Sequence, residues 1–188
     1  MLDDYDLNRI EKNFGLSVLL NTDEYEYLRQ QIGDEYLSEP KEDSLYSLLE
    51  KTFFLKTVEL FRHIPGDILA DIAQISEEIR FEKEHLIFKE GEHGDHMFVV
   101  ISGNVDIIQN GHVIAELETG SCIGEMALLD QEPRSADAKT TADTVLLQIH
   151  QEGFYQLMAS NPRIMQEIVK MLTNRIRQLN QRFTAELS

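Results

Sequence analysis

Two hydrophobic periodicities divide the chain into three parts. Up to about residue 78, and again over 151–182, apolar side chains recur every three or four positions, the spacing of one helix face. Between these parts the period falls to two, as in strands with one buried face. The runs with this period are IRFEK, HLIFK, MFVVI, VDIIQ, HVIAEL and TVLLQIH, separated by turns containing Gly, Asp and Asn. This pattern predicts a mainly β fold with flanking helices: an antiparallel β-roll or jelly roll of about eight strands.

Turn signals and charge help to set the bounds of the predicted elements. Asn110-Gly111 stands between VDIIQ and HVIAEL and is a strong signal for a two-residue hairpin. We expect an acidic helical extension over residues 1–44 and a domain over 45–183. Within that domain we expect the β-roll at about 76–150 and the C-terminal helices at 151–183.

The net charge of the chain limits which kinds of partner it can bind. The 188 residues carry 17 basic and 34 acidic side chains, a net charge of −17. Nucleic-acid binding needs clustered Lys and Arg, so this balance argues against a nucleic-acid partner. Only residues 149–188 have a basic bias, with three acidic and five basic side chains. A site for a small anion would therefore need positive groups of its own.

Signals for membrane insertion, export and disulfide formation are missing from the sequence. No run approaches the roughly 18–20 consecutive apolar residues of a membrane span, and the acidic N-terminus does not resemble a signal peptide. The single cysteine, Cys122, can form no internal disulfide and no cysteine-based zinc site. We expect a cytoplasmic protein with no membrane span.

One segment has the composition of an anion site: GSCIGEMALLDQEPRSA, residues 120–136. A glycine followed by helix-tolerant residues can form a single helical turn whose free backbone N–H groups attract an anion. Arg134, nine positions after Glu125, can fold back to the same place and bind a singly charged phosphodiester. Phosphate would repel Glu125, so we expect its carboxylate to accept a hydrogen bond from a neighbouring hydroxyl, such as a ribose 2′-OH.

The pattern GEMALL, a short spacer and PRSA closely resembles the phosphate-binding cassette of cyclic-nucleotide-binding domains, as in catabolite activator protein, the cAMP-dependent kinase regulatory subunit and cyclic-nucleotide-gated channels. The run EGEHGDHMFVVISGNV, residues 90–105, resembles the glycine-rich turn, apolar strand and hairpin of the same family. The resemblance covers about residues 45–183. It implies a regulatory sensor and not an enzyme, with cAMP as the expected ligand, cGMP as the alternative and no other cofactor.

The resemblance also implies roles within the cassette. Its helical turn corresponds to Gly124, Glu125, Met126 and Ala127. Glu125 is implied to bind the ribose hydroxyl and Arg134 to pair with the cyclic phosphate. Ser135 is implied to add a hydroxyl contact to the phosphate or the base.

Further residues are implied around the ligand: Ile123, Val105, Arg175, Leu179 and Asn180. The first two would line the pocket. Arg175, on the C-terminal helix, would approach the Glu125 carboxylate. On the same helix, Leu179 would cover the base and Asn180 would hydrogen-bond its edge. Ligand binding would then draw this helix over the pocket and control a partner: a second copy of the chain, or a fused or separate effector.

Two alternatives stay open. A degenerate member of the family would act as a ligand-independent structural or interaction module, which the net charge and Asp137 favour. Many relatives carry Thr, Ser or an apolar residue at that position, and the Asp137 carboxylate either faces solvent or weakens anion binding. The other alternative is a cupin-like metal enzyme. The spacing of His93 and His96 does not match the cupin His-x-His pair and no Glu follows at the expected distance, so we expect no metal site. Nothing in the sequence resembles a Ser-His-Asp set or a P-loop, so we expect no catalytic residues.

Overall fold

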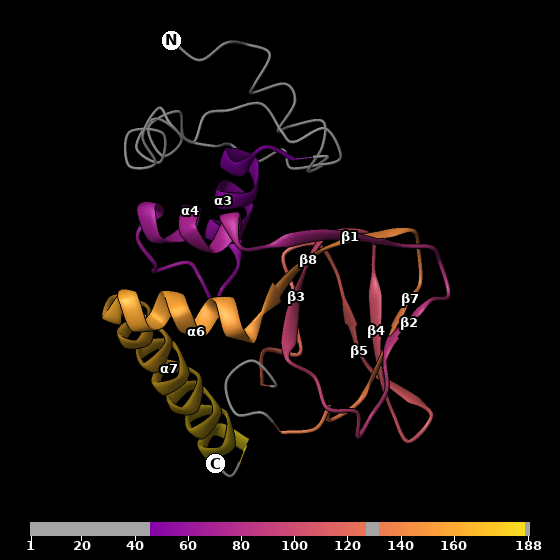
Figure 1. Ribbon diagram of the computed structural model, residues 1–188. Coiled ribbons are helices and arrows are strands. Elements are labelled where there is room, and N and C mark those ends of the chain that lie inside the picture. The colour runs from indigo at the N-terminus through magenta and orange to yellow at the C-terminus, as the bar shows by residue number, and fades with distance from the viewer. Residues whose placement is uncertain (1–45, 127–131, 187–188) are drawn as a thin grey trace, which may run out of the picture.

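Two four-stranded antiparallel sheets form the roll (Figure 1). The computed structural model describes residues 46–126 and 132–186, with only some side chains from residue 171 onward. One sheet has the strand order β1-β8-β3-β6 and the other β2-β7-β4-β5. The strands are β1 (Glu77–Phe81), β2 (Leu86–Phe88), β3 (His96–Ser102), β4 (Val105–Gln109), β5 (His112–Leu117), β6 (Cys122–Ile123), β7 (Asp137–Thr140) and β8 (Thr144–His150).

Helices gather on one side of this roll (Figure 1). In the described part of the chain they are α3 (Leu48–Thr57), α4 (Gly66–Gln74), α6 (Gln151–Ser160) and α7 (Pro162–Glu186). A capping box starts α3: Ser47 Oγ accepts from the Glu50 N–H at 3.3 Å, and the Glu50 carboxylate accepts from the Ser47 N–H at 2.6 Å. Pro162 suits the first position of α7 because a first-turn N–H has no helical acceptor.

Strand β3 is buried on both faces and lies between two hydrophobic cores. Met97, Val99 and Ile101 pack with the helices, whereas Phe98 and Val100 point into the roll interior. Burying such a side chain contributes roughly 1.5–3 kcal/mol, so both faces stabilise the strand. This double burial explains why the run MFVVI is continuously apolar and does not alternate.

The hairpin predicted at Asn110-Gly111 is confirmed. These residues join β4 to β5 with φ angles of 52° and 76°, and Gln109 pairs with His112 across the turn. Positive φ at both central positions is the signature of a type I′ turn, whose twist matches that of the flanking strands.

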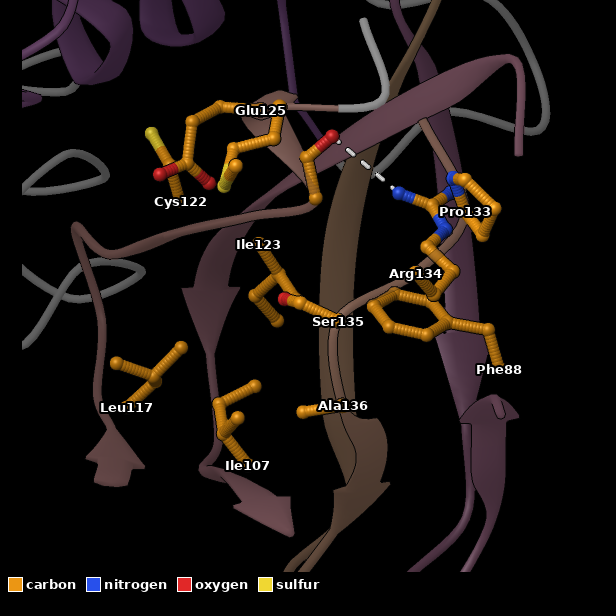
Figure 2. A pocket seen from close by; sticks show the side chains of 12 residues that line it. Phe88, Ile107, Leu117, Cys122, Ile123, Glu125, Pro133, Arg134, Ser135 and Ala136 are labelled. Carbon is orange, nitrogen blue, oxygen red and sulfur yellow. Dashed lines mark hydrogen bonds between the residues drawn. The ribbon is translucent and has the colours of Figure 1, made fainter. Parts of the chain in front are cut away.

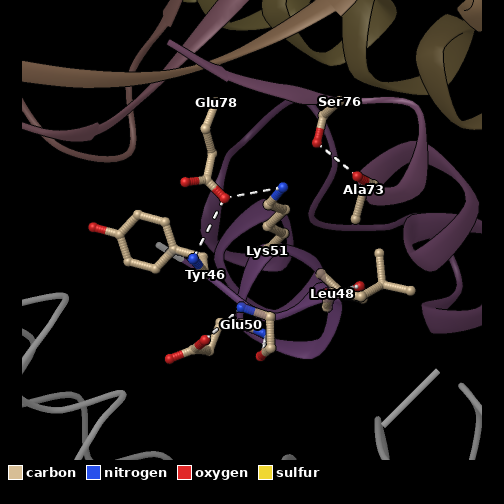
Figure 3. Close-up of polar contacts among 9 residues, drawn as sticks. Tyr46, Leu48, Glu50, Lys51, Ala73, Ser76 and Glu78 are labelled. Carbon is tan, nitrogen blue, oxygen red and sulfur yellow. Dashed lines mark hydrogen bonds and ion pairs between the residues drawn. The ribbon is translucent and has the colours of Figure 1, made fainter. Parts of the chain in front are cut away.

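A polar cluster ties α3 to the start of the roll (Figure 3). Lys51 Nζ lies 3.0 Å from Glu78 Oε1, and the same oxygen accepts from the Tyr46 N–H at 3.4 Å. Both charged side chains are largely buried, so removing one partner would take away the ion pair that offsets the burial of the other charge. Burial, reinforced by the negative charges of Glu78 and Glu50, raises the pKa of the Tyr46 hydroxyl.

The structure confirms a mainly β roll with flanking helices. The helical extension expected over residues 1–44 lies outside the described residues, and the division into domains stays a prediction. In the second C-terminal helix, Ile164 and Ile168 pack against the helical core, whereas Ile176 is 58% exposed. None of the helices described is long and apolar enough to span a membrane.

Candidate functional site

A cavity of about 220 Å³ opens into the roll interior at the cassette (Figure 2). Strands β2, β4, β5 and β6 and the segments on either side of residues 127–131 contribute to its walls. The lining residues are Phe88, Ile107, Leu117, Cys122, Ile123, Gly124, Glu125, Met126, Pro133, Arg134, Ser135 and Ala136. A mostly apolar wall with a few polar groups is typical of small-molecule sites.

Arg134 supplies a buried positive charge to this cavity. The residue is only 5% exposed, and its guanidinium lies 4.2 Å over the Phe88 ring. Nη2 donates to the His96 carbonyl at 2.7 Å, and Nη1 donates to the Gly124 carbonyl at 3.2 Å, the bond dashed in Figure 2. Neutral carbonyls and an aromatic face hold the cation in place without cancelling its charge.

The backbone of Arg134 is anchored to the glycine-rich turn before β3. Its carbonyl accepts from the Gly91 N–H at 2.8 Å, and its own N–H donates to the Glu92 carbonyl at 2.8 Å. This pairing explains why two motifs that resemble the same family occur about 40 residues apart in the chain: the turn at residues 90–94 is the support for Arg134.

Two glycines make room for the guanidinium. A Cβ at Gly94 would lie 2.4 Å from Arg134 Nη2, and a Cβ at Gly124 would lie 2.0 Å from Nη1. Gly124 also has a φ of +74°, which side chains rarely tolerate. Any other residue at either position would displace the guanidinium.

The electrostatics favour an anion at this point. Burial lowers the pKa of the Arg134 guanidinium, and the negative charges of Asp95 and Glu92 oppose that effect. An arginine remains protonated in spite of such a shift, so the cavity keeps a cation within an acidic chain. The desolvation of this charge is a cost that a bound phosphate would offset.

Glu125 stands at the boundary between this cavity and a second one. The second cavity, of about 250 Å³, lies between the α3–α4 connection and the roll and is lined by Val58, Glu59, Leu60, Leu117, Gly120, Ser121, Cys122 and Glu125. In Figure 2 the Glu125 side chain extends away from Arg134, toward the side of Cys122. The Arg134 guanidinium and the Glu125 carboxylate therefore point to different parts of the site.

The predicted site residues fall into four groups. Ile123, Gly124, Glu125, Met126, Arg134 and Ser135 all line the cavity. Val105 is fully buried in the roll core with Ile123 and is not among the lining residues. Ala127 lies outside the described residues. Arg175, Leu179 and Asn180 belong to α7, where the backbone is described and these side chains are not.

Several lining residues were missed in the sequence analysis. Ile107 lies two positions after Val105 and shares its face of β4, so strand alternation could have suggested it. Phe88 carries no local signal, because only the pairing of β2 with β7 brings it under Arg134. Cys122, interpreted as a small core residue, is partly exposed and lines both cavities.

The Asp137 side chain is directed to the backbone of the glycine-rich turn. Its Oδ1 accepts from the Glu90 N–H at 2.7 Å, and the residue is not among those that line the cavity. The carboxylate therefore binds the turn that supports Arg134 and lies outside the cavity lining.

Comparison with known proteins assigns this roll to a family. Residues 78–161 match the family model described as cyclic nucleotide-binding domain. This segment, which runs from β1 through the cassette into α6, belongs to the cyclic nucleotide-binding domain family.

Curated relatives that match include regulators, channels and a cGMP-dependent protein kinase. The CRP-like cAMP-activated global transcriptional regulator of Mycobacterium tuberculosis is 23% identical over 126 residues, which cover 64% of this chain and 56% of the relative. A cyclic nucleotide-gated potassium channel of Mesorhizobium japonicum is 35% identical over 107 residues, 57% of this chain and 30% of the channel. The chain thus spans little more than half, or less, of these relatives. The matched segment is a regulatory module and not an enzyme, which removes the cupin-like alternative.

Solved structures show the same fold. Thermus thermophilus catabolite activator protein is 26% identical, with a TM-score of 0.58, and the match covers 68% of this chain and 62% of that one. The N-terminal domain of a transcriptional regulator from Streptomyces coelicolor is 21% identical with a TM-score of 0.63, covering 69% and 94% of the two chains.

Proposed function

We propose that this chain is a cAMP-responsive regulatory module in which the cyclic phosphate binds Arg134 and the bound nucleotide repositions α7. The observation that carries the proposal is the guanidinium of Arg134. It is buried, held between Gly94 and Gly124, and presented to a cavity lined mainly by apolar side chains. A phosphodiester is a stronger acceptor for it than a neutral carbonyl, because its hydrogen bonds are assisted by charge on both partners.

The size of the cavity indicates how a nucleotide fits. About 220 Å³ is below the roughly 300–1,000 Å³ typical of small-molecule sites. The cavity therefore accepts the phosphate and ribose, with Glu125 on the 2′-OH and Met126 beside it in the same turn. The base then extends past the mouth, where the exposed Ser135 can contact it or the phosphate.

Helix α7 is the proposed cover for that base. Its residues Leu172 and Ile176 are 39% and 58% exposed, so this part of the helix presents apolar surface to solvent. Closure over the base would bury such surface. We propose that it brings Arg175 to Glu125, with Leu179 and Asn180 on the base, so that the nucleotide shifts the population of helix positions.

cAMP is the preferred candidate because the Mycobacterium tuberculosis relative is named as cAMP-activated, with cGMP as the alternative. The output passes through α7 to a partner, either a second copy of the chain or an effector, and we expect the module to work in the cytoplasm.

Calorimetric titration with cAMP and cGMP tests the proposal. Parent protein should bind cAMP, whereas Arg134→Ala should lose about a hundredfold in affinity, roughly 2–3 kcal/mol, with the far-UV circular dichroism unchanged. Arg62→Ala is the matched control, because Arg62 is exposed in the turn after α3 and should leave affinity unchanged. Equal affinity of the Arg134→Ala variant and the parent would exclude the phosphate role.

The ligand-independent alternative has one observation in its favour. Arg134 already donates to two carbonyls and packs on Phe88, so its position is stable with no anion bound. Absence of binding of either nucleotide to the folded parent would favour this alternative over a sensor.

A further inference from the structure

Two histidines far apart in the sequence meet at the junction between the roll and α6. His96 begins β3 and His150 ends β8, and the two are directly paired in the antiparallel register. Their rings lie edge to face with centroids 5.7 Å apart. Asp95 adds a carboxylate, whose Oδ1 lies 2.8 Å from His96 Nδ1.

These three side chains have the composition of a transition-metal site. One ligand atom from each lies within 4.8 Å of the other two. Metal–nitrogen bonds of about 2.0–2.1 Å place tetrahedral ligands roughly 3.4 Å apart, so small side-chain rotations would bring the three onto one ion. Two imidazoles and a carboxylate suit Zn²⁺ and related divalent ions and leave a fourth position for water.

We propose that Asp95, His96 and His150 bind a divalent transition metal, Zn²⁺ in the first instance. Each is partly or fully exposed, so an ion has access to the site. The net charge of −17 raises the local concentration of cations around the chain. This site differs from the His93–His96 pair considered in the sequence, because its second imidazole comes from the far end of β8.

The position of the site connects it to Arg134 and to the start of α6. The His96 carbonyl accepts from Arg134 Nη2 at 2.7 Å. On the other side, His150 is the residue preceding α6, and the first helical N–H, that of Gln151, donates to the Asp95 carbonyl at 2.7 Å. A metal here would fix the start of α6 relative to the strand that holds Arg134.

Metal binding should therefore strengthen nucleotide binding, because a fixed His96 pre-organises the guanidinium. This second step rests on the proposed function, whereas the metal site itself does not. We expect the Zn²⁺-loaded chain to bind cAMP at least about fivefold more tightly than the metal-free chain, the lower end of the range for coupling between sites.

Titration of the purified, chelator-treated chain with ZnCl₂ tests the site. We expect one Zn²⁺ per chain, and Co²⁺ should give the intense visible absorption of tetrahedral coordination. His150→Gln, His96→Gln and Asp95→Asn should each weaken Zn²⁺ binding at least about tenfold, because even residues behind the ligands contribute 10–100-fold. His93→Gln and His112→Gln are matched controls, since both are exposed histidines outside the cluster, and their affinity should equal that of the parent.

The possible results distinguish the metal site, its coupling to cAMP binding and the proposed function. Failure of the parent to bind Zn²⁺, or a loss on His93→Gln without a loss on His150→Gln, overturns the site. If circular dichroism shows that one variant does not fold, the Zn²⁺ affinities of the other two variants and the Co²⁺ spectrum of the parent decide whether the site exists. Zn²⁺ binding with unchanged cAMP affinity overturns the coupling alone. Zn²⁺ binding by a chain that binds no nucleotide overturns the proposed function and leaves the metal site standing.

Discussion

A Cβ atom on Gly94 would lie 2.4 Å from Nη2 of Arg134, closer than real side chains approach. The two residues lie 40 positions apart, and the turn that contains Gly94 is paired to the Arg134 backbone at Gly91 and Glu92. The position of the cation therefore depends on the absence of a side chain at Gly94.

Gly94→Ala should weaken cAMP binding at least about tenfold and change the free energy of unfolding by less than about 1 kcal/mol. The atoms in conflict, Nη2, Cζ and Nε, form the end of a flexible side chain, so we expect the guanidinium to move aside at little cost to the fold while leaving the position needed for phosphate. Calorimetric titration and urea denaturation measure the two quantities. A parent-like affinity would show that the guanidinium is not the phosphate group.

Gly124→Ala has a closely matched control in Gly120→Ala. Both glycines have positive φ, at +74° and +89°, so both variants carry a similar backbone strain of roughly 1–2 kcal/mol. Only the Gly124 variant places a Cβ against Arg134, whereas a Cβ at Gly120 meets nothing within 4 Å. We expect both variants to lose similar stability. Only Gly124→Ala should lose affinity for cAMP. Equal affinities would contradict the packing argument.

Glu125→Ala should weaken binding of cAMP and have much less effect on 2′-deoxy-cAMP. The carboxylate extends away from Arg134, and its proposed partner is the ribose 2′-OH, which the deoxy ligand lacks. Losing a hydrogen bond to a charged group costs about 1.5–3 kcal/mol. Parallel titrations with the two nucleotides make the test, and equal losses for both would contradict the hydroxyl role.

Asp71→Asn should stabilise the fold at pH 7. Burial raises the pKa of Asp71, and the charge of Asp67 one turn earlier adds to the rise. A carboxyl with a raised folded-state pKa stabilises the fold below its ordinary value of 3.8 and loses that contribution as pH rises through the folded value. Asp71 also lies near the C-terminal end of α4, where a negative charge opposes the helix dipole.

The expected gain is about 0.3–1 kcal/mol at pH 7, and it should disappear near pH 3.8. Urea denaturation at both pH values measures it. Asp67→Asn is the control: it removes the same repulsion but also a favourable first-turn acid, so its gain should be smaller. A pH-independent gain from Asp71→Asn would assign the effect to packing.

Hydrogen exchange across α7 tests the proposed cover. Saturating cAMP should increase protection of residues 170–183 as well as of 120–136, because closure of the helix shields its amides and stabilises its end. The Arg134→Ala variant under the same conditions should show neither change. Protection confined to 120–136 would mean that the chain binds nucleotide without using α7 as a cover.

Local patterns in the sequence determined the order of elements, the hairpin at Asn110-Gly111 and the identity of Arg134 as the candidate anion ligand. These features depend on neighbouring residues: side-chain periodicity selects strand or helix, and a residue pair selects the turn. The cassette could be found because its residues are contiguous. Even the apolar run of β3 could be assigned to a strand, although its burial on both faces was not foreseen.

The tertiary structure alone decided what surrounds these residues. Strand pairing brings Phe88 under Arg134, sets His96 opposite His150 and turns the Asp137 carboxylate to the Glu90 N–H. Each of these contacts joins segments far apart in the chain, and each depends on a register in which a one-residue slip would send every side chain of a strand to the opposite face. Periodicity and local motifs do not show which distant strands pair with one another, because that pairing results from packing the whole roll.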